Sequence, residues 1–241
     1  MIFLYYKHRE ELTMNEIIQT KIKKPQFTMY GCGNLNEFNM AKDLTEHMLT
    51  IAKNSAKVLI TIKQLTKNIK EYGEKFMVNA PNTEDQQELY NQFVGDYFEA
   101  FAEYFFKECS NKGQYGIIDY KSSVNNKDWG VDGYGICANQ NDALGGSTPA
   151  VVQIKFRSNP MSEIEYTMLA KTGWDGVKNY GLDINRKNNV ILFCNTEKGA
   201  NYLAQQAMQD NLLVIDMRDL DKDITGIKTV KFWEDFLKEF V

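Results

Sequence analysis

The chain contains 241 residues with a formal net charge of −4, and 43% of its residues are hydrophobic and 12% aromatic. This length supports one sizeable core plus an appended element, and the slight negative charge excludes a protein that coats nucleic acid through bulk positive charge. The four cysteines form no C-x-x-C pair, which excludes a zinc ribbon or a disulfide framework, and no apolar run has the length of a signal core or a membrane span, so we expect a cytoplasmic protein without a membrane partner.

The first residues of the chain carry little structural signal. Residues 1–13 show no periodic pattern, and Met14 followed by Asn15 and Glu16 resembles a normal start, so an alternative translation start at Met14 stays open. From Lys21 to Asn34 the pattern indicates loop or a short strand, because proline and glycine interrupt it.

The clearest periodic pattern lies between about Asn39 and Phe76. Apolar residues there recur in alternating steps of four and three, with one polar member, which predicts a single long helix with a heptad seam. The seam consists of Leu44, Met48, Ile51, Ser55, Val58, Ile62, Leu65, Ile69, Tyr72 and Phe76. The opposite arc carries positive charge from Lys53, Lys57, Lys63, Lys67 and Lys70.

Two interpretations of this helix stay open. In the first, the seam forms a coiled coil that joins two copies of the chain in a homodimer, and the lysines face DNA or another polyanion. In the second, the helix packs along its own domain and the lysines are solvated. We therefore expect residues 1–80 to form a helical segment for dimerisation or DNA contact, and residues 81–241 to form a separate domain.

A second helix is predicted from Thr83 to about Glu108. Thr83-Glu84-Asp85-Gln86 matches a capping box, and the following residues include an unusually aromatic apolar arc. Glu99 lies off this arc beside Gly95 and Ala102, so we expect another group to approach the helix closely there.

The remaining pattern alternates strands and helices. Strands are predicted near residues 116–120, 130–138, 150–156, 189–194 and 212–216, and helices near residues 162–180, 198–209 and 231–240. A second capping box, Ser162-Glu163-Ile164-Glu165, is expected to begin the first of these helices. This order predicts an α/β fold with a mixed β-sheet flanked by helices.

The predicted strand at Val151–Arg157 carries the polar residues that indicate a reactive site. As a strand it directs Gln153 and Lys155 to one face and Val152, Ile154 and Phe156 to the other. If Asp132 lies on a neighbouring strand, its carboxylate joins these two side chains beside a divalent cation that prefers oxygen ligands. The pattern therefore favours a metal-dependent hydrolytic site.

These motifs resemble the PD-(D/E)xK nuclease superfamily, and within it the Mrr-like restriction endonucleases that carry Q-x-K. The resemblance covers about residues 90–220, roughly half the chain. Its departures are Trp129, where that family usually has Gly, and a long insert before Gln153. The matching segments, in chain order, are Phe98-Glu99, Asp128-Trp129-Gly130-Val131-Asp132, Val152-Gln153-Ile154-Lys155 and Leu213-Val214-Ile215-Asp216.

The resemblance implies a restriction-type DNA endonuclease that uses Mg²⁺, with Mn²⁺ as an alternative ion. It assigns Asp132 as the direct metal ligand, and the Gln153 side-chain carbonyl and Ile154 backbone carbonyl as neutral ligands. Glu99 would act directly or through a bound water, and Lys155 would orient or deprotonate the attacking water or stabilise the transition state. Arg157 joins the lysines of the first helix as an expected nucleic-acid contact.

Each assignment has an alternative in the sequence. Asp128 or Asp119 could replace Asp132, and Glu103, one turn after Glu99, competes for the helix position. Gln153 and Lys155 could instead be exposed positions on an edge strand. His8 and His47 are the only histidines and lie in the N-terminal third, which argues against histidine-based chemistry.

Other functions remain in view. They are a nuclease specific for junctions, flaps or RNA, and a catalytically inactive nuclease fold that binds nucleic acid.

Overall fold

The structure is a computed structural model, and it describes residues 35–54, 60–78, 82–110, 115, 117–123, 130–137, 148–222 and 228–240. Three positions discussed above lie outside these residues. They are Met14, the alternative translation start, Lys57 of the lysine arc, and Asp128, the alternative to Asp132. The helices are α2 (Leu35–Asn54), α3 (Ile62–Met77), α4 (Thr83–Ser110), α5 (Tyr166–Tyr180), α6 (Tyr202–Ala207), α7 (Met217–Lys222) and α8 (Val230–Lys238). The strands are β1 (Ile117–Ser122), β2 (Gly133–Cys137), β3 (Pro149–Lys155), β4 (Val190–Cys194) and β5 (Leu212–Ile215).

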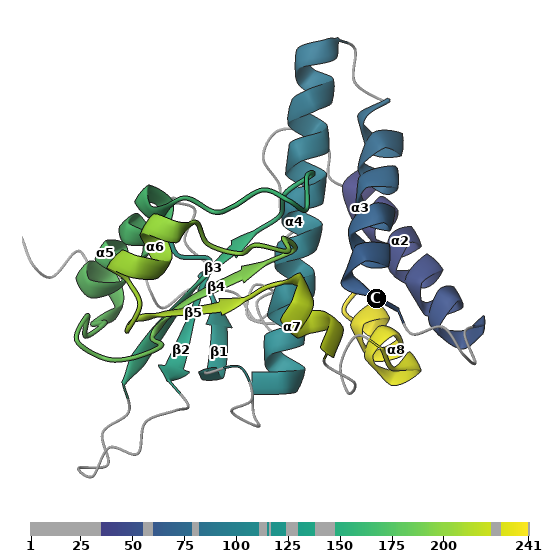
Figure 1. Ribbon diagram of the computed structural model, residues 1–241. Helices are drawn as coiled ribbons and strands as arrows, with labels where there is room; N and C mark the ends of the chain where they lie inside the picture. Colours follow the sequence, from purple (N-terminus) through teal and green to yellow (C-terminus); the bar gives the residue numbers. More distant parts are fainter. Residues whose placement is uncertain are drawn as a thin grey trace, which may run out of the picture.

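The five strands form one sheet in the order β1-β2-β3-β4-β5 (Figure 1). The first three strands are antiparallel, and β4 and β5 continue parallel to β3. The predicted α/β fold with a mixed sheet is therefore confirmed. Because β3 pairs with β2 on one side and β4 on the other, Gln153 and Lys155 belong to the central strand, and the edge-strand alternative is wrong.

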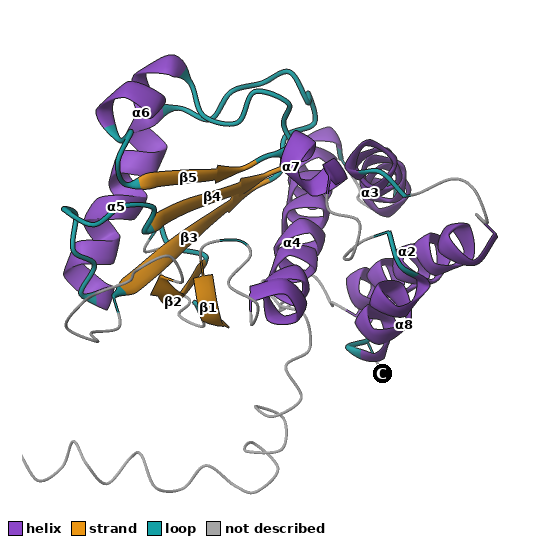
Figure 2. Ribbon diagram, turned by 60° about the horizontal axis from the view of Figure 1, so that its bottom comes forward, coloured by secondary structure: helices purple, strands orange, loops and turns teal. Residues whose placement is uncertain are grey.

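Helices cover both faces of the sheet. Figure 2 shows α5 and α6 on one side and α4 on the other, with α2, α3 and α8 beyond α4. The long helix α4 is thus buried from two directions, which explains its many aromatic residues. Phe101 lies 6.3 Å from Phe193 of β4 and 6.1 Å from Trp233 of α8, measured between ring centroids.

The single long helix expected from Asn39 to Phe76 is wrong, because α2 and α3 are separate helices. Thr61 caps α3, its hydroxyl accepting from the Gln64 backbone N–H at 3.1 Å. The Ile62 N–H donates to the Asp221 carboxylate of α7 at 2.7 Å, which fixes the start of the helix. The heptad spacing continues across the break because both helices bury their apolar sides in the same core.

The described seam residues pack inside the chain, which favours the second interpretation of the pattern. Leu44 and Met48 of α2, and Leu65 and Ile69 of α3, are fully buried. They belong to one hydrophobic cluster that also contains residues of α4, α8 and the sheet. The seam is therefore not available as a coiled-coil surface for a second copy, and the two regions divided near residue 80 share a core.

Both expected capping boxes are displaced. Asn82, rather than Thr83, caps α4, since its Oδ1 accepts from the Asp85 N–H at 2.9 Å. The helix expected at Ser162 begins at Tyr166, and no side chain caps it. Ile164 instead forms an isolated parallel β-bridge with Ala200, so this segment is extended and paired with the residues that precede α6.

Two carboxylates, the buried Glu37 of α2 and the partly buried Asp96 of α4, act on each other through their charges. Glu37 is almost fully buried and accepts a hydrogen bond from the Gln92 amide at 3.2 Å. Burial, and then the nearby Glu37 charge, raise the pKa of Asp96 to about 7. Burial also raises the pKa of Glu37. As the pH rises through the pKa of Asp96, repulsion between the two carboxylates therefore increasingly opposes the packing of α2 on α4.

We predict that Asp96→Asn reduces the loss of stability as pH rises. The folded state keeps a proton on Asp96 up to a pKa of about 7, whereas the ordinary value is 3.8. Between these values the folded state binds more protons, so the free energy of unfolding falls with rising pH. Melting temperatures from about pH 5 to about pH 8 should fall more steeply for the parent chain than for Asp96→Asn.

The matched control is Glu88→Gln, which removes an exposed carboxylate from the same helix. It should follow the parent curve. Parallel curves for the parent and Asp96→Asn would contradict the assignment.

Candidate active site

Three consecutive residues of β3 meet one carboxylate oxygen. Asp132 directly precedes β2, and its backbone N–H donates to the Val152 carbonyl of β3 at 2.9 Å. Its Oδ2 accepts from the Ile154 N–H at 2.6 Å and from the Gln153 side-chain amide. The Lys155 ammonium lies 3.9 Å from the same oxygen. The structure thus brings together Asp132, Gln153 and Lys155, as the sequence predicts.

The turn before Asp132 requires glycine. Gly130 has a φ of 66°, in the left-handed region that disfavours other residues. A Cβ there would also lie 2.7 Å from the Lys171 ammonium and 2.8 Å from the Asp175 carboxylate, which form an ion pair on α5. The turn therefore sits directly against α5, and this contact places Asp132 beside β3.

The side chains of β3 divide between the two faces of the sheet as expected. Val152 and Ile154 belong to the core cluster that includes α4. Gln153 is only 2% exposed and lies on the other face, where its Oε1 accepts from the Thr172 hydroxyl of α5 at 2.7 Å. The sequence did not single out Thr172. The feature that could have identified Thr172 is that a polar residue lies on the buried face of α5, among Leu169, Gly173 and Gly176.

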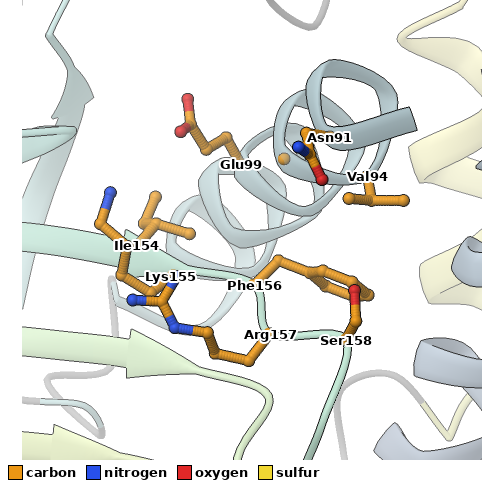
Figure 3. Close-up of a pocket in the computed structure, with 9 residues that line it drawn as sticks. Asn91, Val94, Glu99, Ile154, Lys155, Phe156, Arg157 and Ser158 are labelled. Carbon is orange, nitrogen blue, oxygen red and sulfur yellow. The ribbon is translucent and has the colours of Figure 1, made fainter. Parts of the chain in front are cut away.

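A cleft of about 420 Å³ opens between α4 and the carboxyl end of β3. Figure 3 shows Glu99 on the helix, and Lys155 and Arg157 at the strand end, around this hollow. Gly95 lines it beside Glu99, but a Cβ at Gly95 would meet nothing within 4 Å, so the close approach expected at that face is wrong and the face is open to the cleft. The cleft therefore combines one carboxylate with two cationic side chains.

The backbone of Arg157 is fixed by a buried side chain. Its N–H donates to the Asn195 Oδ1 at 2.7 Å, and the Asn195 amide donates back to the Arg157 carbonyl at 2.9 Å. Asn195 directly follows β4 and is fully buried. This pair of hydrogen bonds holds the chain where β3 ends, so that Arg157 lines the cleft.

The competing carboxylates occupy other surroundings. Glu103 is nearly buried and forms an ion pair with Lys107 at 3.0 Å, whereas Glu99 lines the cleft. Asp119 is exposed on β1. The geometry therefore favours Glu99 and Asp132 over these two alternatives.

Tyr120 is a further residue near the site that the sequence did not reveal. Its ring stacks on Phe106 at 4.9 Å, and its buried hydroxyl has no hydrogen-bond partner within the described part of the chain. Burial, followed by the charges of Glu103, Asp132 and Glu99, raises the pKa of this hydroxyl well above its usual value. Tyr120 therefore presents a neutral hydroxyl against Gly133, the residue that follows Asp132.

Two local features bring Tyr120 to this position. The register of β1 against β2 shifts between Ile118 and Lys121, where Asp119 has a positive φ of 52°, and such a bulge redirects the following side chain. A Cβ on Gly133 would overlap the Tyr120 ring and hydroxyl, so Gly133 provides the space that the ring fills.

The donor set indicates which cation the site could hold. Among the described residues, no group of three or more His, Cys, Asp or Glu side chains is placed to bind a metal. Asp132 offers one carboxylate at this point and Glu99 lines the adjoining cleft, whereas the Gln153 amide oxygen faces Thr172 of α5. Mg²⁺ usually binds through one or two carboxylates, several waters and a substrate phosphate, so this set suits Mg²⁺ better than a soft metal.

Comparisons with known proteins give little for function. No family model matches the sequence, and no curated protein matches it. A solved structure titled "MspJI Restriction Endonuclease in Complex with 27-mer Oligonucleotide" is similar with a TM-score of 0.38 and 20% identity. The similarity covers 70% of this chain and 38% of that chain, so this chain spans well under half of that one. A likeness of this size carries no weight for function, which must follow from the side chains.

Within the described residues, no helix combines the length and apolar character needed to cross a membrane.

We predict that Gly133→Ala destabilises the fold through Tyr120. The added methyl group overlaps the tyrosine ring, and overpacking of this kind costs about 1–3 kcal/mol of the free energy of unfolding. Chemical denaturation measures the change. Gly95→Ala is the matched control, because a Cβ at that helical position meets nothing within 4 Å and should be neutral or stabilising.

A double-variant cycle tests the cause. In a Tyr120→Ala background the cost of Gly133→Ala should largely disappear. An unchanged cost would show that the glycine is required for another reason.

Proposed function

We propose that the chain is a Mg²⁺-dependent DNA endonuclease that hydrolyses phosphodiester bonds, of the Mrr-like restriction type that carries Q-x-K. The observation that carries this proposal is the convergence of Gln153, the Ile154 N–H and Lys155 on the Asp132 carboxylate. This convergence lies at the carboxyl end of a central strand, beside a cleft lined by Glu99.

The chain's own residues have distinct tasks in this reaction. Asp132 would hold Mg²⁺ or Mn²⁺ through its carboxylate, with the Gln153 and Ile154 carbonyl oxygens as neutral ligands. When bound, the cation polarises the phosphoryl oxygen and lowers the pKa of a water. Lys155, 26% exposed and next to Asp132, is placed to stabilise the negative charge that develops on the phosphorane. Glu99 would orient the attacking water from the opposite wall.

The charge of the site suggests that metal and DNA bind together. Gln153 is neutral where the superfamily usually has an acidic ligand, so the site has one negative charge fewer to attract a cation. We infer that Mg²⁺ binds weakly until a DNA phosphate completes its coordination. The phosphate would also meet the positive side chains of Lys155 and Arg157.

The expected DNA contacts differ in how close they lie to the cleft. Arg157 lines the cleft, and Lys70 of α3 donates to the carbonyl of Ser158, another cleft residue, at 3.2 Å. Lys63 is exposed on the same helix, and Lys67 pairs with Glu71. Lys53 lies on α2 and forms a 3.0 Å ion pair with Glu234 of α8. Arg157 and Lys70 are therefore best placed to bind phosphates that enter the cleft.

A homodimer would supply two active sites, one for each strand of a duplex. Since the heptad seam is buried, such a dimer would have to use another surface. Sedimentation of the full chain with and without a short duplex measures whether two copies assemble.

Cleavage of supercoiled plasmid in Mg²⁺ tests the proposed activity. The parent chain should cut, and Asp132→Asn and Lys155→Ala should lower the rate by at least about 100-fold, because each removes a group that acts on the transition state. Asp119→Asn is the matched control, because Asp119 is exposed on the same hairpin and Asn tolerates its positive φ. EDTA should abolish cutting.

Other outcomes identify the alternative functions. Cutting by both variants at the parent rate would refute the site assignment. Cutting of junctions, flaps or RNA in preference to duplex DNA would identify a structure-specific or RNA nuclease. Binding without cutting of any substrate would identify a catalytically inactive nucleic-acid-binding module.

We predict that Arg157→Ala weakens DNA binding uniformly across sequences. Loss of one phosphate contact should reduce the slope of log affinity against log salt concentration by about 0.9. Fluorescence anisotropy with a labelled duplex in EDTA measures this slope without cleavage. Lys53→Ala is the matched control, because this lysine is already paired with Glu234. Equal slopes for the parent and Arg157→Ala would exclude a phosphate contact.

A further inference from the structure

The side-chain amide of Gln153 bridges the proposed metal site and α5. Its nitrogen donates to the Asp132 carboxylate, and its oxygen accepts from the Thr172 hydroxyl at 2.7 Å. Gln153 is 2% exposed and Thr172 is fully buried, so water does not substitute readily for either partner. The two ends of the amide therefore need partners from the chain.

This orientation does not suit a metal ligand. A cation is bound by the amide oxygen, but here the nitrogen faces Asp132 and the oxygen faces α5. A half-turn of the amide about its terminal bond exchanges the two ends. The oxygen then faces the Asp132 side, and the nitrogen faces Thr172.

Thr172 can satisfy either orientation. A hydroxyl group donates one hydrogen bond and also accepts. In the orientation observed, it donates to Gln153. After the half-turn it would accept from the Gln153 nitrogen and donate its own proton to the Met168 carbonyl, which lies 3.2 Å away. With a cation between the Gln153 oxygen and Asp132, no buried polar group of this set loses its partner after the half-turn.

The packing of α5 keeps this hydroxyl close to β3. Gly173 and Gly176 share the buried face of the helix with Thr172. A Cβ on Gly176 would lie 3.1 Å from the Val151 side chain, so the glycine permits the close approach of helix and strand. Thr172 is therefore held at hydrogen-bonding distance from Gln153 by the backbone of both elements.

We propose that Thr172 is a positioning residue that allows the Gln153 amide to turn its oxygen toward a cation held by Asp132. This inference rests on the proposed metal-dependent function. Without a cation, the amide nitrogen is hydrogen-bonded to Asp132; with a cation, the amide oxygen becomes a ligand and Thr172 accepts from the nitrogen.

A simpler role for Thr172 must be distinguished. A threonine in a helix often donates to the backbone carbonyl four residues earlier, and this bond has no role in ligand binding. Met168 is such a partner for Thr172. Three variants separate the two roles. Thr172→Ser keeps the hydroxyl, Thr172→Val replaces it with a methyl group of similar size, and Thr172→Ala removes it without adding a second methyl group.

Mn²⁺ titration of the full chain with a short phosphorothioate duplex that resists hydrolysis, followed by the EPR signal of the free ion and with the duplex alone as the blank, measures metal binding without any cleavage. Thr172→Ser should match the parent, and Thr172→Val and Thr172→Ala should bind Mn²⁺ about 10-fold more weakly or worse, the usual cost of losing a group that orients a ligand. Thermal unfolding in EDTA establishes that each variant is folded.

A second comparison uses Gln153→Glu, whose carboxylate presents an oxygen in either orientation. In this background the effect of Thr172→Val on Mn²⁺ affinity should shrink to about twofold or less. An equal loss in both backgrounds would mean a purely structural role and would overturn the inference.

The failure of this inference and of the proposed function are distinguishable. Parent-like Mn²⁺ binding by Thr172→Val, with plasmid cleavage by the parent, would overturn the inference alone. Absence of Mn²⁺ binding by the parent with the duplex present, or full binding by Asp132→Asn, would overturn both the metal site and the inference.

Discussion

The hydrogen bonds to the Asp132 carboxylate are the interaction on which the site depends. A carboxylate beside a central strand is costly unless donors surround it, and here the strand supplies a backbone N–H and a side-chain amide, with an ammonium group at 3.9 Å. The same contacts fix where β2 begins relative to β3. The contacts that set the register of β2 against β3 therefore also assemble the proposed site.

The layered packing keeps this site at an edge of the core where a substrate can enter. Helix α4 is buried between the sheet and the layer of α2, α3 and α8, and only the part near Gly95 and Glu99 lines the cleft. On the other face, α5 approaches β3 through small residues and brings Thr172 to Gln153. One wall of the proposed site is thus closely packed, and the Gln153 amide is the group that we propose to turn.

The sequence predicted those parts of the fold that depend on local periodicity. The alternation along β3 correctly assigned Val152 and Ile154 to one face and Gln153 to the other, and the continuous apolar run at Val190–Cys194 correctly indicated a buried strand. The long helix failed because period alone does not reveal a cap: Thr61 and the contact from Asp221, distant in sequence, divide it. Tyr120 and Thr172 were missed because a bulge and a helix–strand contact place them, and neither follows from residue type.

The most direct test is the position of Mn²⁺ by anomalous diffraction, in crystals of the full chain bound to a short duplex. The account predicts a peak bonded to an oxygen of Asp132 and to the Gln153 side chain through its Oε1, beside a DNA phosphate. A peak at other residues, or no ion between Asp132 and the phosphate, would contradict it.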